Sequence, residues 1–85
     1  MRHEPSTARM VRRLGDSPSR RGSSSGATCP DLFELADGDF AVIGTDRTEE
    51  LDRLLPNDAS RADHERLVVI TRETLIRAKR DIPDA

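Results

Sequence analysis

The chain has 85 residues, a formal net charge of −2 and one cysteine, so it has room for one small domain, and a framework of disulfides within the chain is excluded. It contains no run of 18 apolar residues, which excludes a membrane-spanning helix from the expected structure. The N-terminus also lacks the apolar stretch of a secretory signal, and we therefore expect a cytoplasmic location.

Charge is distributed unevenly along the chain. Residues 1–29 carry six Arg against two acidic residues, a net of +4, whereas residues 30–85 carry eight basic against fourteen acidic residues, a net of −6. Two segments of opposite charge attract each other or attract different partners. The change falls at Cys29-Pro30 and divides the chain into an Arg- and Ser-rich arm, residues 1–28, and a small domain, residues 29–85.

The arm contains one candidate helix, residues 7–14, in which Met10, Val11 and Leu14 share a face. This helix is too short to be stable alone. Residues 19–26 are too polar and too rich in Gly and Ser to offset the entropy lost on ordering. The sequence therefore predicts that residues 1–28 are disordered in isolation.

The domain begins with a predicted β-hairpin. Residues 32–36 and 39–44 form two short apolar runs around Asp37-Gly38, the kind of dipeptide that type I′ hairpin turns prefer. Phe40, Val42 and Ile43 have the shapes that pack well in strands.

A first helix is predicted after the hairpin. Asp46 can cap its N-terminus, with Glu49 in the capping-box position, and an apolar stripe at helical spacing follows, formed by Leu51, Leu54 and Leu55. Pro56 ends this helix, and residues 57–65 form a long polar loop without any large apolar side chain.

Residues 67–70 are apolar throughout, which is typical of a strand buried on both faces. Thr71 can cap a last helix that runs to about Ile82, where Leu75, Ala78 and Ile82 share a face. Glu73 precedes Arg77 by four residues, a favourable spacing for an ion pair, and Pro83 ends the helix.

These elements predict an α+β fold with the order ββαβα, a three-stranded sheet with the third strand central, and two helices on one face. The other face is left open, and it must be shielded by the arm or by another molecule. Residues 30–85 hold sixteen large apolar residues, too few to make the core of so small a domain more than marginal. We therefore expect self-association or docking on a partner.

No residue pattern indicates catalysis or metal binding. Cys29 lacks a CxxC partner, so a structural role is expected, and His64 lies in the polar loop without a second ligand at metal spacing. Asp37 and Asp39 are explained by the hairpin turn, and together with Glu34 and Asp46 they lack the spacing of a calcium-binding loop. We expect no enzyme activity, no metal and no cofactor.

Two functional hypotheses follow. The first is an interaction or regulatory accessory module that docks a protein partner, or itself as a homodimer, through an apolar sheet face formed by Phe33, Leu35, Phe40 and Val42. The alternative is a nucleic-acid-associated protein whose arm neutralises phosphates through Arg9, Arg12, Arg13, Arg20 and Arg21. The arm has no aromatic residue to stack on bases, which weighs against this alternative.

Three stretches, CPDLFEL (29–35), DGDFAVIGTD (37–46) and ERLVVITRETL (65–75), resemble a group of small actinobacterial proteins of unassigned function. The resemblance covers residues 29–83 and excludes the arm. Such proteins are often encoded near helix-turn-helix regulators, so the resemblance implies an accessory role in regulation and a single domain over these residues. It implies no catalytic or binding residue.

Overall fold

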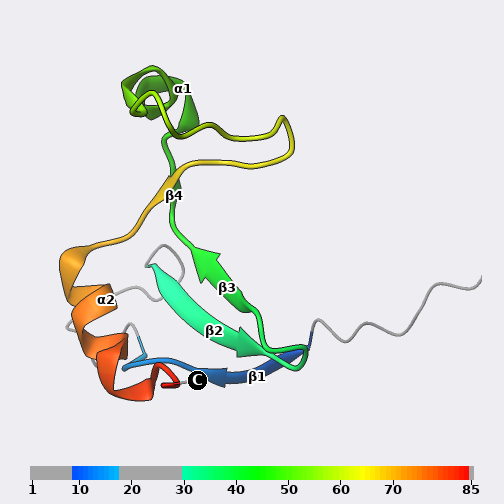
Figure 1. The fold of residues 1–85 in the computed structure, drawn as a ribbon. Coiled ribbons are helices and arrows are strands. Elements are labelled where there is room, and N and C mark those ends of the chain that lie inside the picture. The colour runs from blue at the N-terminus through cyan, green and yellow to red at the C-terminus, as the bar shows by residue number, and fades with distance from the viewer. Residues whose placement is uncertain (1–8, 18–29, 85) are drawn as a thin grey trace, which may run out of the picture.

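The computed structural model describes residues 9–17 and 30–84. It has an α+β fold with a three-stranded antiparallel sheet and two helices, which confirms the predicted fold class (Figure 1). The elements follow in the order β1 (Met10–Arg13), β2 (Asp31–Leu35), β3 (Phe40–Ile43), β4 (Thr45–Asp46), α1 (Thr48–Leu51), β5 (Val68–Val69) and α2 (Arg72–Ala78). A 3₁₀ turn continues each helix, over Asp52–Leu54 and Lys79–Asp81.

β2 and β3 form the predicted hairpin, with Phe33 opposite Ala41. The turn is not type I′, because that type requires positive φ at both central residues and no described residue other than glycine has positive φ. Instead, the Gly38 N–H donates to the Leu35 carbonyl at 3.0 Å and Gly38 has a φ of 96°. This is the three-residue loop in which a type I turn ends in a left-handed glycine.

The third strand of the sheet is β1, from the N-terminal arm. The helix predicted over residues 7–14 is wrong, because β1 is extended and pairs antiparallel with β2, with Arg13 opposite Phe33. The pairing continues beyond the strand, where the Leu14 N–H donates to the Leu32 carbonyl at 2.9 Å. An eight-residue helix has little stability of its own. The extended conformation instead forms backbone hydrogen bonds with the side of β2 that does not face β3.

Residues 9–17 therefore take part in the fold, although the sequence analysis places them in a disordered arm. The remainder of that arm, residues 1–8 and 18–28, lies outside the described residues, as does Cys29. The domain boundary at residues 28 and 29 stays a prediction.

The strand predicted over residues 67–70 does not lie at the centre of the sheet. The two-residue strand β5 pairs with β4, with Val69 opposite Thr45, in a separate two-stranded ladder, and β2 is the central strand of the three-stranded sheet. Val68 is 41% exposed, so burial on both faces is also wrong. Gly44 permits the close approach of this ladder, because a Cβ there would lie 2.7 Å from the Val69 carbonyl oxygen.

Both predicted helices form, and both are shorter than expected. The N-cap residue of α1 is Arg47, without a side-chain cap bond, so the predicted capping box of Asp46 and Glu49 is wrong. The Asp46 carboxylate still accepts a hydrogen bond from the N–H of Thr48, the first residue of α1, at 3.0 Å. In α2, the Thr71 hydroxyl accepts from the Thr74 N–H at 3.2 Å, which confirms the predicted cap. The ion pair between Glu73 and Arg77 also forms, at 2.8 Å.

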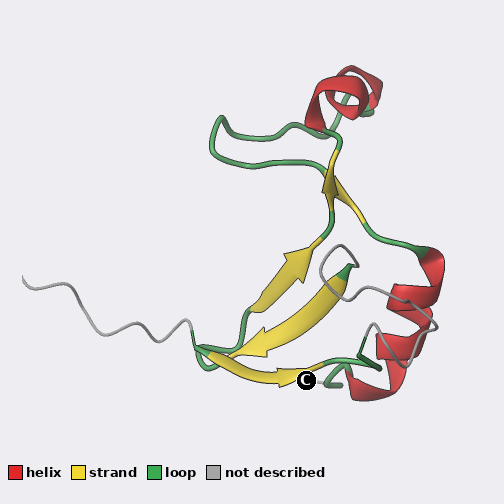
Figure 2. Cartoon of the chain, turned by 180° about the vertical axis from the view of Figure 1, so that it is seen from behind, coloured by secondary structure: helices red, strands yellow, loops and turns green. Residues whose placement is uncertain are grey.

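The core of the described residues is small. Leu14, Leu32 and Ala78 are its buried hydrophobic residues, and Ile70 packs against them. α2 packs against β2, whereas α1 and the polar loop of residues 57–65 lie apart from the sheet, beyond the β4–β5 ladder (Figures 1 and 2). Much of the apolar surface of this chain is therefore left in contact with solvent.

Candidate functional site

An apolar groove lies between α2 and the three-stranded sheet. It has a volume of about 160 Å³ and is lined by Leu14, Leu32, Phe40, Leu75 and Ile82. Leu14 and Leu32 are buried, and the other three side chains are 46–53% exposed. The groove is therefore an extension of the small core that opens to solvent.

Val42 extends this apolar surface along β3. It lies opposite Leu32 in the β2–β3 register, and opposite residues of an antiparallel pair point to the same face. Phe40 is on that face too, two residues before Val42, and Val42 is 45% exposed. We use the name groove face for the surface formed by Leu14, Leu32, Phe40, Val42, Leu75 and Ile82.

The four residues predicted to form one apolar face lie on two faces. Phe40 and Val42 belong to the groove face. Phe33 and Leu35 alternate with Leu32 along β2 and so point to the opposite face, where the Arg13 guanidinium lies 5.0 Å from the centre of the Phe33 ring. This cation–π contact already occupies one side of Phe33.

Sequence reasoning missed four members of the groove face: Leu14, Leu32, Leu75 and Ile82. The helical spacing of Leu75 and Ile82 identified one face of α2, but it did not show which strands that face meets. Leu14 lies in the segment predicted to be a helix, and only its backbone hydrogen bond to Leu32 places it beside the sheet.

Two of the arginines assigned to nucleic acid bind carboxylates of the same chain. The Arg12 Nε lies 2.7 Å from a Glu34 oxygen, and its Nη2 donates to the Asp81 carbonyl at 2.6 Å. The Arg13 Nε lies 3.0 Å from the buried Asp31 carboxylate. These two side chains hold β1 on the sheet, and a phosphate would have to compete with those carboxylates.

The other arginines of that set are Arg9, Arg20 and Arg21. Arg9 is exposed, and Arg20 and Arg21 lie outside the described residues. Among the described residues, the structure brings Arg12 and Arg13 of this set together, and both bind acidic side chains.

The Asp16 carboxylate of the N-terminal segment is bound by arginines of α2 and of the 3₁₀ turn that follows it. Asp16 accepts hydrogen bonds from Arg77 at 2.7 Å and from Arg80 at 2.9 Å. These bonds, that from Arg80 most strongly, hold the pKa of Asp16 below its ordinary value. The Gly15 N–H donates to the Asp81 carboxylate at 2.7 Å. At the other end of the segment, the Ala36 N–H donates to the Arg9 carbonyl at 2.9 Å, so both ends of residues 9–17 are hydrogen-bonded to the rest of the fold.

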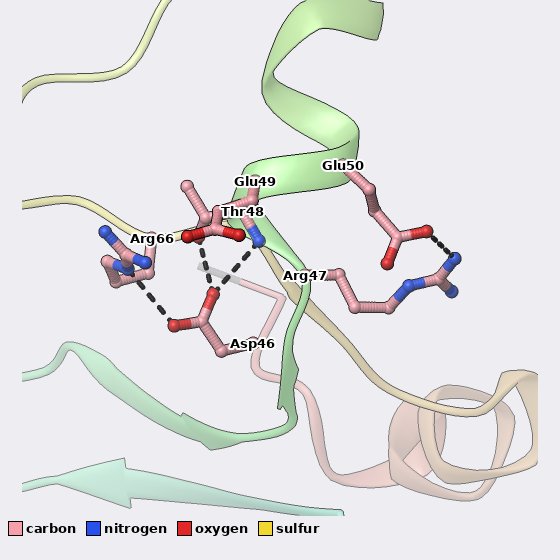
Figure 3. Close-up of a pocket in the computed structure, with 6 residues that line it drawn as sticks. All are labelled: Asp46, Arg47, Thr48, Glu49, Glu50 and Arg66. Atoms are coloured by element: carbon pink, nitrogen blue, oxygen red, sulfur yellow. Dashed lines mark hydrogen bonds and ion pairs between the residues drawn. The ribbon is translucent and has the colours of Figure 1, made fainter.

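A polar pocket of about 370 Å³ lies where β4 enters α1 (Figure 3). The Asp46 carboxylate accepts from the Thr48 hydroxyl at 2.6 Å and pairs with Arg66 at 3.2 Å. These contacts, with the Thr48 hydroxyl first, lower the pKa of Asp46. Arg47 pairs with Glu50 at 2.6 Å, and Glu49 completes the lining.

The polar groups of this pocket mainly bind one another. The Thr48 hydroxyl also accepts from the Leu67 N–H at 2.8 Å, and the Arg47 N–H donates to the Leu67 carbonyl at 2.8 Å. Asp46, with its lowered pKa, stays ionised near neutral pH, so it is unsuited to donate a proton. The arrangement joins the start of α1 to the strand β5, and we assign it a structural role.

The remaining candidate residues are separated from one another. Asp37 accepts from the Asp39 N–H at 2.9 Å within the hairpin turn, and His64 is exposed in the polar loop. Within residues 9–17 and 30–84, no three His, Cys, Asp or Glu side chains are grouped as metal ligands. No helix in the described part of the chain is long and apolar enough to cross a membrane.

Comparison of this chain with protein-family models, curated proteins and solved structures gives no match. The resemblance to small actinobacterial proteins stays a prediction.

Proposed function

We propose that this chain is a small, non-enzymatic protein-interaction module that binds its partner through the groove face, in the cytoplasm. The observation that supports this proposal is the imbalance between buried and exposed apolar groups. Leu14, Leu32 and Ala78 are the buried hydrophobic residues of the described chain, whereas ten large hydrophobic side chains are more than 40% exposed. Four of these ten, Phe40, Val42, Leu75 and Ile82, are grouped on the groove face, and such grouping next to a groove is typical of interaction surfaces.

The size of the groove face limits how tightly it can bind by itself. Covering the exposed half of Phe40, Val42, Leu75 and Ile82 contributes about 0.7–1.5 kcal/mol for each side chain, or roughly 3–6 kcal/mol together. Association costs at least about 4 kcal/mol in lost freedom of motion. The groove face alone therefore gives weak binding, and a specific partner must add polar contacts beside it.

The proposal can be tested by placing a photo-crosslinking amino acid, p-benzoylphenylalanine, at position 40 in cells that produce the chain. We expect a covalent adduct with a protein from position 40 and none from position 58, which lies in the exposed polar loop. Loss of the adduct on Leu75→Lys, and its retention on Ile76→Lys, would place the contact on the groove side of α2, because Ile76 does not line the groove. The absence of any adduct from position 40 would contradict the proposal.

The nucleic-acid alternative is not adopted here. Its support was the positive charge of the arm, and Arg12 and Arg13 are paired with carboxylates in the folded chain. It stays a prediction that binding experiments can test.

A further inference from the structure

The strand β3 forms an unprotected edge of the sheet. The strand order is β1-β2-β3, and no described element lies along the outer side of β3 (Figures 1 and 2). Natural edge strands are usually protected by a charged residue, a proline or a bulge. The four residues of β3 are Phe, Ala, Val and Ile, and their register with β2 is regular.

The hairpin determines which backbone groups of β3 point outward. The Leu35 N–H donates to the Asp39 carbonyl at 2.8 Å, and hydrogen-bonded and non-hydrogen-bonded pairs alternate along an antiparallel ladder. Ala41 and Ile43 therefore direct their N–H and C=O groups toward β2. Phe40 and Val42 direct theirs away from it, which leaves two donors and two acceptors on the outer edge.

We propose that the partner is a second copy of this chain, and that the two β3 strands pair antiparallel about a two-fold axis at Ala41. This inference rests on the proposed function and names its partner. In this register Phe40 lies opposite Val42 of the second copy, and the two residues exchange both hydrogen bonds. The same exchange is repeated on the other side of the axis, so all the outward groups of both β3 strands are used.

The side chains support the same register. It sets an aromatic ring against a β-branched side chain twice, which is a favourable cross-strand combination. Asp39 falls opposite Ile43 of the second copy, so no like charges meet along the paired strands. A register centred on Val42 would instead place Phe40 opposite Gly44 and lose both aromatic contacts.

The helices of the two copies have room on one face of the joined sheet. A two-fold axis that relates antiparallel neighbouring strands is perpendicular to the sheet, so both groove faces point the same way. The two β2 strands are then three strand spacings apart, roughly 14 Å, and each α2 packs over its own β2. Helices are about 10–12 Å wide, so the two α2 helices fit side by side at this spacing without overlapping.

Cysteine crosslinking tests this register directly. Cys29 is the only cysteine of the chain, so Ala41→Cys and Val42→Cys are compared on a Cys29→Ser background at ~100 μM under mild oxidation. At the axis, the two residues at position 41 form a non-hydrogen-bonded pair with Cα atoms about 4.5 Å apart, within disulfide range. The two residues at position 42 lie about 7–8 Å apart on a diagonal, beyond that range.

We expect the Ala41→Cys variant to form a species of twice the 9.5 kDa chain mass and the Val42→Cys variant to stay monomeric. Crosslinking at position 42 instead of 41, equal crosslinking at both, or none at either would overturn the proposal.

Sedimentation of chains without introduced cysteines gives an independent test. We expect the mass of the wild type to approach that of a dimer as its concentration rises to ~100 μM, and Phe40→Lys to abolish this increase. Val11→Lys is the matched control, because Val11 is 54% exposed on the opposite edge strand β1, and we expect it to dimerise like the wild type. A monomeric wild type, or a loss of dimer with Val11→Lys, would overturn the inference.

The photo-crosslinking experiment separates this inference from the proposed function. An adduct from position 40 to a different protein would overturn the homodimer and leave the interaction module standing. An adduct between two copies would support both.

Discussion

Gly15 lies where the N-terminal segment passes α2, and two separate constraints act on it. Its φ is 83°, and a Cβ there would lie 3.1 Å from backbone atoms of Arg77 and Ala78. Gly38 also has a positive φ, but a Cβ there would meet no atom within 4 Å. We expect Gly38→Ala to cost about 1–2 kcal/mol from backbone strain, and Gly15→Ala to cost roughly 1–3 kcal/mol more from overpacking. Urea unfolding of the two variants measures the difference, and equal costs would show that residue 15 does not approach α2.

Asp16 gives the fold a dependence on pH. Because Arg80 and Arg77 lower its pKa in the folded chain, ionised Asp16 favours folding at pH values above its ordinary pKa of 3.8, and this contribution is lost as the pH falls through the folded value. We expect Asp16→Asn to lower the melting temperature at pH 7 and to have a much smaller effect at pH 3. Asp58→Asn, in the exposed loop, controls for the loss of one charge. A deficit for Asp16→Asn that is equal at both pH values would contradict this linkage.

The strand β1 makes the N-terminal segment part of the core, through Leu14. Leu14 is 4% exposed, whereas Val11 on the same segment is 54% exposed. We expect Leu14→Ala to destabilise the chain by about 2–5 kcal/mol, as for other buried leucines, and Val11→Ala to change stability by less than about 0.5 kcal/mol. Thermal and urea unfolding by circular dichroism measure both. If Leu14→Ala had no effect, the segment would be a disordered arm, as its composition suggests.

The elements that the sequence predicts correctly carry their own local signals. The hairpin has Asp37-Gly38 between apolar runs, and α2 has Thr71 as its cap. β1 has no such signal, because Met10, Val11 and Leu14 can share a helical face and the strand that pairs with them begins at Asp31. For the same reason, the sequence predicted only Phe40 and Val42 of the six groove-face residues. These residues come from three distant segments, and only the register between strands shows which of them share a face.

Opposite charges on the two parts of the chain hold the described N-terminal segment, residues 9–17, on the rest of the fold. Arg12 and Arg13 of the basic segment pair with Glu34 and Asp31 of the acidic one, and Asp16 pairs in the other direction, with α2. The exposed pairs contribute little each, and Asp31 of the Arg13 pair is buried. Together these contacts fix the position of β1 on the sheet. The positive charge that remains for an external polyanion is therefore smaller than the sequence implies.

Because Arg12 and Arg13 are paired within the fold, nucleic-acid binding is better tested with point variants than with a deletion. Deleting residues 1–28 would also remove β1 and Leu14 from the fold, so a loss of binding would not identify a phosphate contact. Arg20→Gln with Arg21→Gln leaves β1 intact. We expect the wild type to bind a 20-base-pair duplex with a Kd of ~100 μM or weaker at 150 mM salt, the weak limit of non-specific binding, since its net charge is −2. Fluorescence anisotropy measures this value, and a micromolar Kd that is lost in the double variant would instead favour the nucleic-acid function.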